Sequence, residues 1–136
     1  MTPEQAIQAI THWAEARSDV EAVALVGSWA RGAARPDSDV DVVILCANPS
    51  AYLAYDSWMT DFGTVDQVAA EDWGAVGAWR VFYQGGLEVE FGFTTAAWAR
   101  TDPVDRGTRR VVRGGLRALV DKHGLLRALS DSVSKG

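Results

Sequence analysis

The sequence predicts a single α/β (α+β) domain that spans residues 1–136. A length of 136 residues is typical of one domain. Apolar residues at helical spacing near the N-terminus are followed by short apolar segments with the composition of buried strands. Later in the chain, two segments rich in β-forming residues are separated only by Gly85-Gly86, which is the turn chemistry of a hairpin.

The first helix is expected from Thr2 to about Ser18. Thr2 can cap this helix, a proline occupies its first position, and Gln5 can complete a capping box. Residues 20–26 are mostly apolar and end at Gly27, which favours a strand that is buried on both faces.

A short helix and a second buried strand are expected next. Ser28 can cap a helix that runs to about Ala34, because Pro36 disfavours helical backbone at the residue before it. The apolar run 42–45 predicts a strand that starts near Asp39 and enters the core.

The rest of the chain alternates between helical and strand patterns. The expected elements are a helix over 49–62 ended by Gly63, a strand over 64–69, the hairpin strands 79–84 and 87–93, a second turn at Gly114-Gly115 between strand-like residues 111–112 and 116–120, and a short amphipathic segment over 125–129.

The charge and cysteine content limit the classes of function that the protein can have. Thirteen Lys and Arg residues against eighteen Asp and Glu residues give a net charge of −5, which argues against general nucleic-acid binding. The arginine-rich stretch 106–117 could meet a triphosphate or an anionic acceptor, but such a run is more often a solvated face. The single cysteine, Cys46, lies in an apolar run and suits a reducing compartment. With no signal-peptide pattern or membrane-spanning apolar stretch, we expect a cytoplasmic protein with no membrane partner.

Residues 27–41 combine three features that favour phosphate and metal chemistry. A helix that begins after Gly27-Ser28 presents backbone N–H groups and a hydroxyl to an anion at its N-terminus. Asp39 and Asp41 are two apart in a strand, so both side chains point to one face. Two carboxylates together with substrate phosphates are the oxygen ligands that Mg²⁺ prefers.

The segments Gly27-Ser28, Ala30-Arg31-Gly32 and Ser38-Asp39-Val40-Asp41 resemble the signature of the DNA-polymerase-beta-like nucleotidyltransferase superfamily, and in particular its minimal and aminoglycoside-modifying branches. The resemblance implies a mixed, mainly antiparallel sheet with helices packed mostly on one face. It also implies a site at the sheet edge where two aspartates meet a third carboxylate.

By this resemblance, Gly27 and Ser28 hold the β- and γ-phosphates of a nucleoside triphosphate such as ATP, and Arg31 is a further phosphate contact. Asp39 and Asp41 bind Mg²⁺, with two ions expected. The matched third carboxylate is Glu90, which is also the candidate base. Glu88 is the alternative on the same strand face.

The activity implied by the resemblance is transfer of a nucleoside monophosphate to an acceptor hydroxyl, with release of pyrophosphate. The acceptor stays open, because 136 residues leave no room for the further helical domain of aminoglycoside-modifying members. Minimal members often work beside a separate helical protein, which suggests a toxin–antitoxin arrangement. The alternative function is a non-catalytic binding module with the same fold that neutralises a helical partner, as an antitoxin does.

Overall fold

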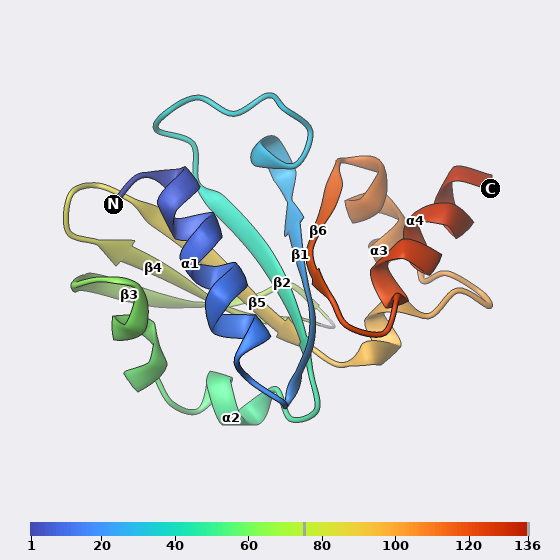
Figure 1. Ribbon diagram of the computed structural model, residues 1–136, viewed down its shortest axis with the longest axis horizontal. Coiled ribbons are helices and arrows are strands. Elements are labelled where there is room, and N and C mark those ends of the chain that lie inside the picture. Colours follow the sequence, from blue (N-terminus) through green and yellow to red (C-terminus); the bar gives the residue numbers. More distant parts are fainter. Residues whose placement is uncertain (75, 136) are drawn as a thin grey trace.

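The computed structural model, which describes residues 1–74 and 76–135, is built around one six-stranded sheet (Figure 1). In chain order the strands are β1 (Val20–Val26), β2 (Val40–Cys46), β3 (Val65–Asp72), β4 (Gly77–Tyr83), β5 (Glu88–Thr94) and β6 (Leu116–Asp121). Their order in the sheet is β3-β4-β5-β2-β1-β6. The β2–β5 pair is parallel and the other four pairs are antiparallel. The α/β class and the mixed, mainly antiparallel sheet are therefore confirmed.

Helices cover both faces of this sheet, whereas we expected them mostly on one. The helical elements are α1 (Pro3–Glu15), η1 (Gly27–Trp29), α2 (Ser50–Leu53), η2 (Ser57–Phe62), η3 (Ala96–Ala99), α3 (Arg106–Arg113) and α4 (Leu125–Lys135), where η denotes a 3₁₀ helix. One core cluster joins α1, α2 and η2 to one face, and a second joins η3, α3 and α4 to the other. The reason is that β1 and β2 are apolar on both faces, so each face needs a cover.

The N-terminal helix forms as its sequence predicts, except that it ends earlier. The Thr2 hydroxyl accepts a hydrogen bond from the Gln5 N–H at 3.1 Å, and the Gln5 side chain accepts one from the Thr2 N–H at 2.9 Å. This is the expected capping box. The buried residues Ile7 and Ile10 fix α1 against the sheet.

The helix expected over 49–62 is split into α2 and η2. Trp58 is the second residue of η2, and its indole N–H donates to the carbonyl oxygens of Tyr52 at 3.0 Å and Tyr55 at 2.8 Å. These carbonyls are therefore bound to a side chain instead of continuing a helical ladder.

The hairpin expected around Gly114-Gly115 is instead the junction between α3 and β6. The Asp105 carboxylate caps α3 by accepting from the Thr108 N–H at 3.1 Å. The buried Thr108 hydroxyl donates to the Trp98 carbonyl at 3.0 Å, which ties the helix to η3.

The hairpin of β4 and β5 around Gly85-Gly86 is confirmed, as is the buried Cys46 thiol in β2. Among the described residues, no helix combines the length and apolar character that crossing a membrane would require.

Candidate functional site

The candidate site lies where β2 and β5, the parallel pair, run side by side at the centre of the sheet. Asp41 of β2 is directly paired with Glu90 of β5. Asp39 precedes β2 by one residue, and Glu88 begins β5. Because side chains alternate along a strand, all four carboxyl groups project from the same face of the sheet. The expectation that the third carboxylate shares the face of the two aspartates is therefore confirmed.

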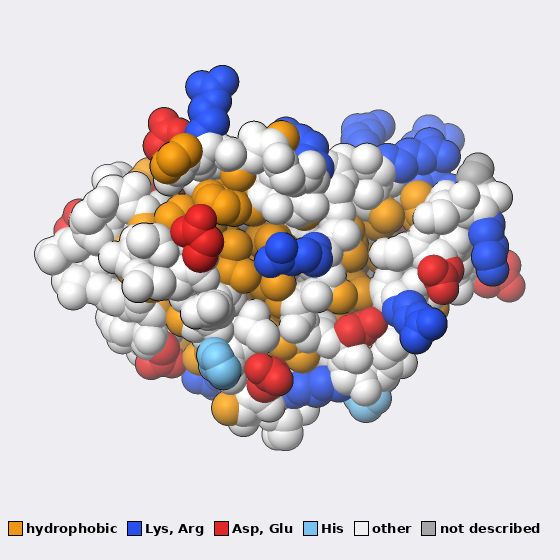
Figure 2. All heavy atoms as spheres, turned by 45° about the horizontal axis from the view of Figure 1, so that its top comes forward, with side chains coloured by type: hydrophobic (Ala, Val, Ile, Leu, Met, Phe, Trp, Pro, Cys, Tyr) orange, Lys and Arg blue, Asp and Glu red, His pale blue; other side chains and the backbone are white. Residues whose placement is uncertain are grey.

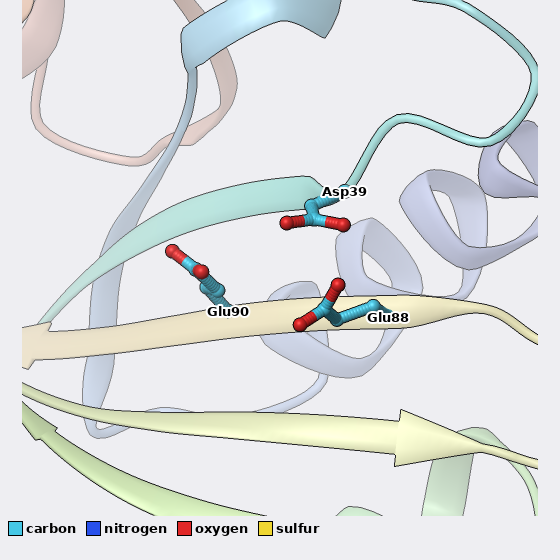
Figure 3. A group of neighbouring side chains, drawn as sticks. All are labelled: Asp39, Glu88 and Glu90. Carbon is cyan, nitrogen blue, oxygen red and sulfur yellow. The ribbon is translucent and has the colours of Figure 1, made fainter.

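Three of these carboxyl groups form a compact cluster. One oxygen from each of Asp39, Glu88 and Glu90 lies within 4.8 Å of the others, and all three side chains are partly buried. Figure 3 shows the Asp39 carboxyl, at the start of β2, facing the two glutamates that rise from β5. The structure thus brings Glu88 into the cluster beside Glu90 and does not separate the two candidates for the third carboxylate.

Asp41 extends the cluster toward the β1–η1 turn. Burial, a hydrogen bond to the Glu90 carboxyl and the negative charges of Glu90 and Asp39 together raise the pKa of Asp41 to about 8. A hydrogen bond between two carboxyl groups requires a shared proton. The Asp41 and Glu90 pair therefore holds a proton at neutral pH in the absence of a cation.

Glu88 and Asp39 are coupled in the same way. A hydrogen bond to Asp39, followed in importance by burial and the charge of Asp39, raises the pKa of Glu88 to about 7. The raised pKa values of Asp41 and Glu88 indicate that the cluster holds more negative charge than its surroundings neutralise.

The cation next to this cluster is Arg80 of β4. Its guanidinium forms ion pairs with Glu88, at 2.9 Å from Nη1 to Oε1, and with Glu90 through Nη2. It also pairs with Glu71 of β3, at 2.5 Å from Nε to Oε1. Arg80 could not be predicted from the sequence, because a single arginine in a β-rich segment carries no motif. Only the register of β4 against β5 brings it to the site.

A hollow of about 500 Å³ opens beside the aspartates. It is lined by Gly27, Ser28, Arg31, Arg35, Asp37, Ser38, Asp39 and Asp41. All the phosphate-binding residues predicted from the sequence, together with both aspartates, are therefore on its wall. Arg35 is a second basic residue that the sequence analysis did not select.

Glycine is required at the turn where the hollow meets β2. Gly27 has φ +74, and a Cβ atom at this position would lie 2.7 Å from Asp41 Oδ2. The turn continues as the three-residue helix η1, shorter than the helix to Ala34 that Ser28 was expected to cap. The Trp29 indole N–H donates to the Ser38 carbonyl at 3.2 Å, which ties the start of the 30–38 loop to its end.

The arginine-rich stretch 106–117 does not line this hollow. Arg106, Arg110, Arg113 and Arg117 are exposed. Figure 2 shows Lys and Arg side chains gathered toward the upper right of the view, on the side of the molecule where α3 lies. This agrees with the solvated face that the sequence favoured.

Comparison with known proteins finds a family similar to the part of the chain that contains the two aspartates. The family described as "Nucleotidyltransferase domain" matches residues 8–74, a region that contains Gly27, Ser28, Asp39 and Asp41. This segment, just under half of the chain, is therefore similar to nucleotidyltransferase domains. No curated protein matches its sequence.

The fold is also similar to that of a solved structure. An aminoglycoside 6-adenyltransferase from Bacillus subtilis superposes with a TM-score of 0.55 at 13% sequence identity. The similarity covers 71% of this chain but only 36% of the adenyltransferase chain. The shared part is thus most of this chain and about a third of the larger protein.

The carboxyl cluster has the ligand chemistry that a divalent metal requires. Asp39, Glu88 and Glu90 bring carboxylate oxygens together, and the pKa values of Asp41 and Glu88 stay raised although Arg80 pairs with Glu88 and Glu90. Hard cations such as Mg²⁺ bind carboxylate oxygens and compete with protons for them. The residues present therefore fit a magnesium site.

Proposed function

We propose that this protein is an enzyme that transfers a nucleoside monophosphate from a nucleoside triphosphate, with ATP as the first candidate, to an acceptor hydroxyl. The observation that carries the proposal is the convergence of Asp39, Asp41 and Glu90 at the edge of the hollow that begins at Gly27-Ser28. A hollow whose lining includes both arginines and aspartates suits a metal-bound triphosphate.

Gly27, Ser28 and Arg31 bind the β- and γ-phosphates in this proposal. All three line the hollow, and Arg31 is exposed, so its guanidinium can reach a ligand there. A guanidinium binds phosphate through two parallel hydrogen bonds. Because Gly27 has no side chain, a phosphate can approach the backbone closely.

Asp39, Asp41 and Glu90 would hold the Mg²⁺, with two ions proposed. Bound there, the metal would neutralise phosphate charge and polarise the α-phosphate. Glu90 orients the acceptor hydroxyl and accepts its proton. The acceptor oxygen bonds to the α-phosphorus, the bond from that phosphorus to the bridging oxygen breaks, and pyrophosphate leaves with the electron pair.

The position of the label in the triphosphate tests the reaction. ATP labelled at the α-phosphate is incubated with the protein, Mg²⁺ and a panel of acceptors, namely sugars, aminoglycosides, nucleic-acid ends and proteins. We expect the label to become covalently attached to one acceptor class, whereas label at the γ-phosphate leaves with pyrophosphate. Transfer of γ-label to the acceptor would show phosphoryl transfer and contradict the proposal.

Two glutamine variants separate catalysis from folding. Glu90→Gln removes the proposed proton acceptor, so we expect transfer to fall by about two orders of magnitude or more, while the protein stays folded. Glu15→Gln, at the exposed end of α1, is the matched control and should retain parental activity. Equal activity of the two variants would refute the role of Glu90.

The family resemblance also supports a separate helical partner protein, as in a toxin–antitoxin pair, and the buried Cys46 thiol is compatible with a reducing cytoplasm. Purification of the protein from its native cells, followed by identification of co-eluting proteins, tests the partner. If instead the protein binds such a partner but transfers no label, it acts as a non-catalytic binding module.

A further inference from the structure

Arg80 lies between two strands that carry acidic side chains. In the sheet register it is opposite Ala69 of β3 on one side and Glu90 of β5 on the other. Glu71 and Glu88 are each two residues from these positions on the same strands, so their side chains project from the same face as Arg80. One guanidinium therefore reaches carboxylates from both neighbouring strands.

Each terminal nitrogen of this guanidinium holds one glutamate of the cluster. Nη1 pairs with Glu88 Oε1 at 2.9 Å, and Nη2 pairs with Glu90 Oε1. Each glutamate then has a second oxygen that is not engaged by these two ion pairs. One oxygen of each glutamate lies within 4.8 Å of the other and of an Asp39 oxygen. Arg80 of β4 therefore pairs with both glutamates of the cluster.

The third nitrogen anchors Arg80 on the side away from the cluster. Arg80 Nε donates to Glu71 Oε1 at 2.5 Å, and Glu71 Oε2 accepts from the Trp73 indole N–H at 2.9 Å. The hydrogen bond from Trp73, followed by the contacts with Arg80, lowers the pKa of Glu71. Glu71 is therefore a fixed carboxylate that aligns the guanidinium.

We propose that Arg80 is a positioning residue that fixes the orientation of Glu88 and Glu90, so that the site discriminates Mg²⁺ from larger divalent cations. Mg²⁺ demands near-ideal octahedral geometry, whereas Ca²⁺ accepts irregular ligand sets with longer bonds. Groups that orient metal-ligating side chains from behind strongly affect metal affinity. This inference rests on the proposed function, because it assumes that the cluster binds a metal ion.

Arginine is suited to this task in a way that lysine is not. Its planar group presents nitrogens in fixed directions, and here three of them serve three different carboxylates. A lysine ammonium keeps the positive charge but is a compact point on a flexible stem. Replacement by lysine therefore preserves charge while removing directional restraint.

The test compares two metals without turnover. Binding of a non-hydrolysable ATP analogue is titrated calorimetrically in the presence of Mg²⁺ or Ca²⁺, for the parent and for Arg80→Lys and Arg80→Gln. Because both ions carry the same charge, the loss of a nearby positive charge affects both affinities and largely cancels in their ratio. We expect the preference for Mg²⁺ over Ca²⁺ to fall by about tenfold in both variants.

One further variant weakens the anchor of Arg80, and another serves as a control. Glu71→Gln weakens the anchor without altering the cluster, so we expect a smaller shift in the same direction. Arg17→Gln removes an arginine that pairs with Asp61, away from the cluster, and should leave the metal ratio unchanged. If Arg80→Gln does not fold, Arg80→Lys and Glu71→Gln still test the proposal.

The outcomes separate this inference from the proposed function. A parental metal ratio in Arg80→Lys would mean that the directional hydrogen bonds of the guanidinium do not set the metal preference and would overturn the positioning role. A parental ratio in every folded variant would overturn it too, while leaving the proposed function intact. If the parent itself binds no analogue in either metal, the proposed function fails, and this inference fails with it.

Discussion

Replacing Asp41 by asparagine should stabilise the metal-free protein while abolishing metal-dependent nucleotide binding. The Asp41 carboxyl is partly buried, shares a hydrogen bond with Glu90 and lies near the negative charge of Asp39. An asparagine side chain has nearly the same shape but no charge, so it relieves this repulsion. It also removes one of the proposed metal ligands.

The expected gain follows from the pKa of the carboxyl. Burial and the hydrogen bond with Glu90 raise the pKa of Asp41 from 3.8 to about 8. At about 1.4 kcal/mol per pKa unit, this corresponds to an upper bound of about 6 kcal/mol, and solvent screening at a partly exposed carboxyl reduces it to about 1–3 kcal/mol. Because the folded protein holds the proton more tightly than the unfolded chain, its stability falls as the pH rises from about 4 to 8.

The assay is urea denaturation followed by tryptophan fluorescence, in the presence of a chelator, at pH 5, 7 and 9. Asp41→Asn should exceed the parent in free energy of unfolding by about 1–3 kcal/mol at pH 9, and this difference should shrink as the pH approaches 4. Asp37→Asn, at an exposed position in the loop that precedes β2, should change stability by less than about 0.5 kcal/mol. A pH-independent difference, or an Asp41→Asn variant less stable than the parent at pH 9, would refute this reasoning.

Three further substitutions test neighbouring features. Gly27→Ala places a Cβ 2.7 Å from Asp41 Oδ2 at φ +74, so thermal denaturation should show a loss of stability of about 1–3 kcal/mol. Calorimetry should show a loss of Mg²⁺-dependent nucleotide binding, and unchanged binding would argue against phosphate binding at the Gly27-Ser28 turn. Arg31→Gln should weaken triphosphate binding by about tenfold and leave stability within about 0.5 kcal/mol, whereas equal affinity would exclude Arg31 as a phosphate contact. Thr2→Ala removes the capping interaction with Gln5 and should cost about 1 kcal/mol of stability, so a variant as stable as the parent would contradict the capping role.

Local patterns predicted the parts of the fold whose causes are local. The capping box of Thr2 and Gln5 lies within four residues, and the apolar runs of β1 and β2 bury both faces of each strand. The two-residue spacing of Asp39 and Asp41 placed both on one face, which needs only strand geometry. These features therefore followed from the sequence.

Other elements depended on partners distant in the chain. The break after α2 depends on the Trp58 indole binding two carbonyls, which helical spacing does not reveal. Residues 111–112 resemble a strand, yet α3 forms because Asp105 caps it and Thr108 bonds to Trp98. The Asp105 cap was a visible signal, but the β-branched pair before Gly114-Gly115 concealed it.

The candidate site was also predicted only in part from the sequence. The motif of residues 27–41 identified the hollow and its aspartates, whereas the roles of Glu88 and Arg80 depend on sheet register. Arg80 meets glutamates from β3 and β5, and this arrangement exists only when three strands are aligned. Sequence spacing within one strand cannot specify it.

The central claim, that Asp39 and its neighbours bind a metal-bound triphosphate, is tested most directly by calorimetric titration with a non-hydrolysable ATP analogue, with and without Mg²⁺. The parent should bind the analogue at millimolar or lower concentration only when Mg²⁺ is present, and Asp39→Asn should lose this binding while remaining folded. Absence of Mg²⁺-dependent binding in the parent, or full binding by Asp39→Asn, would contradict the claim.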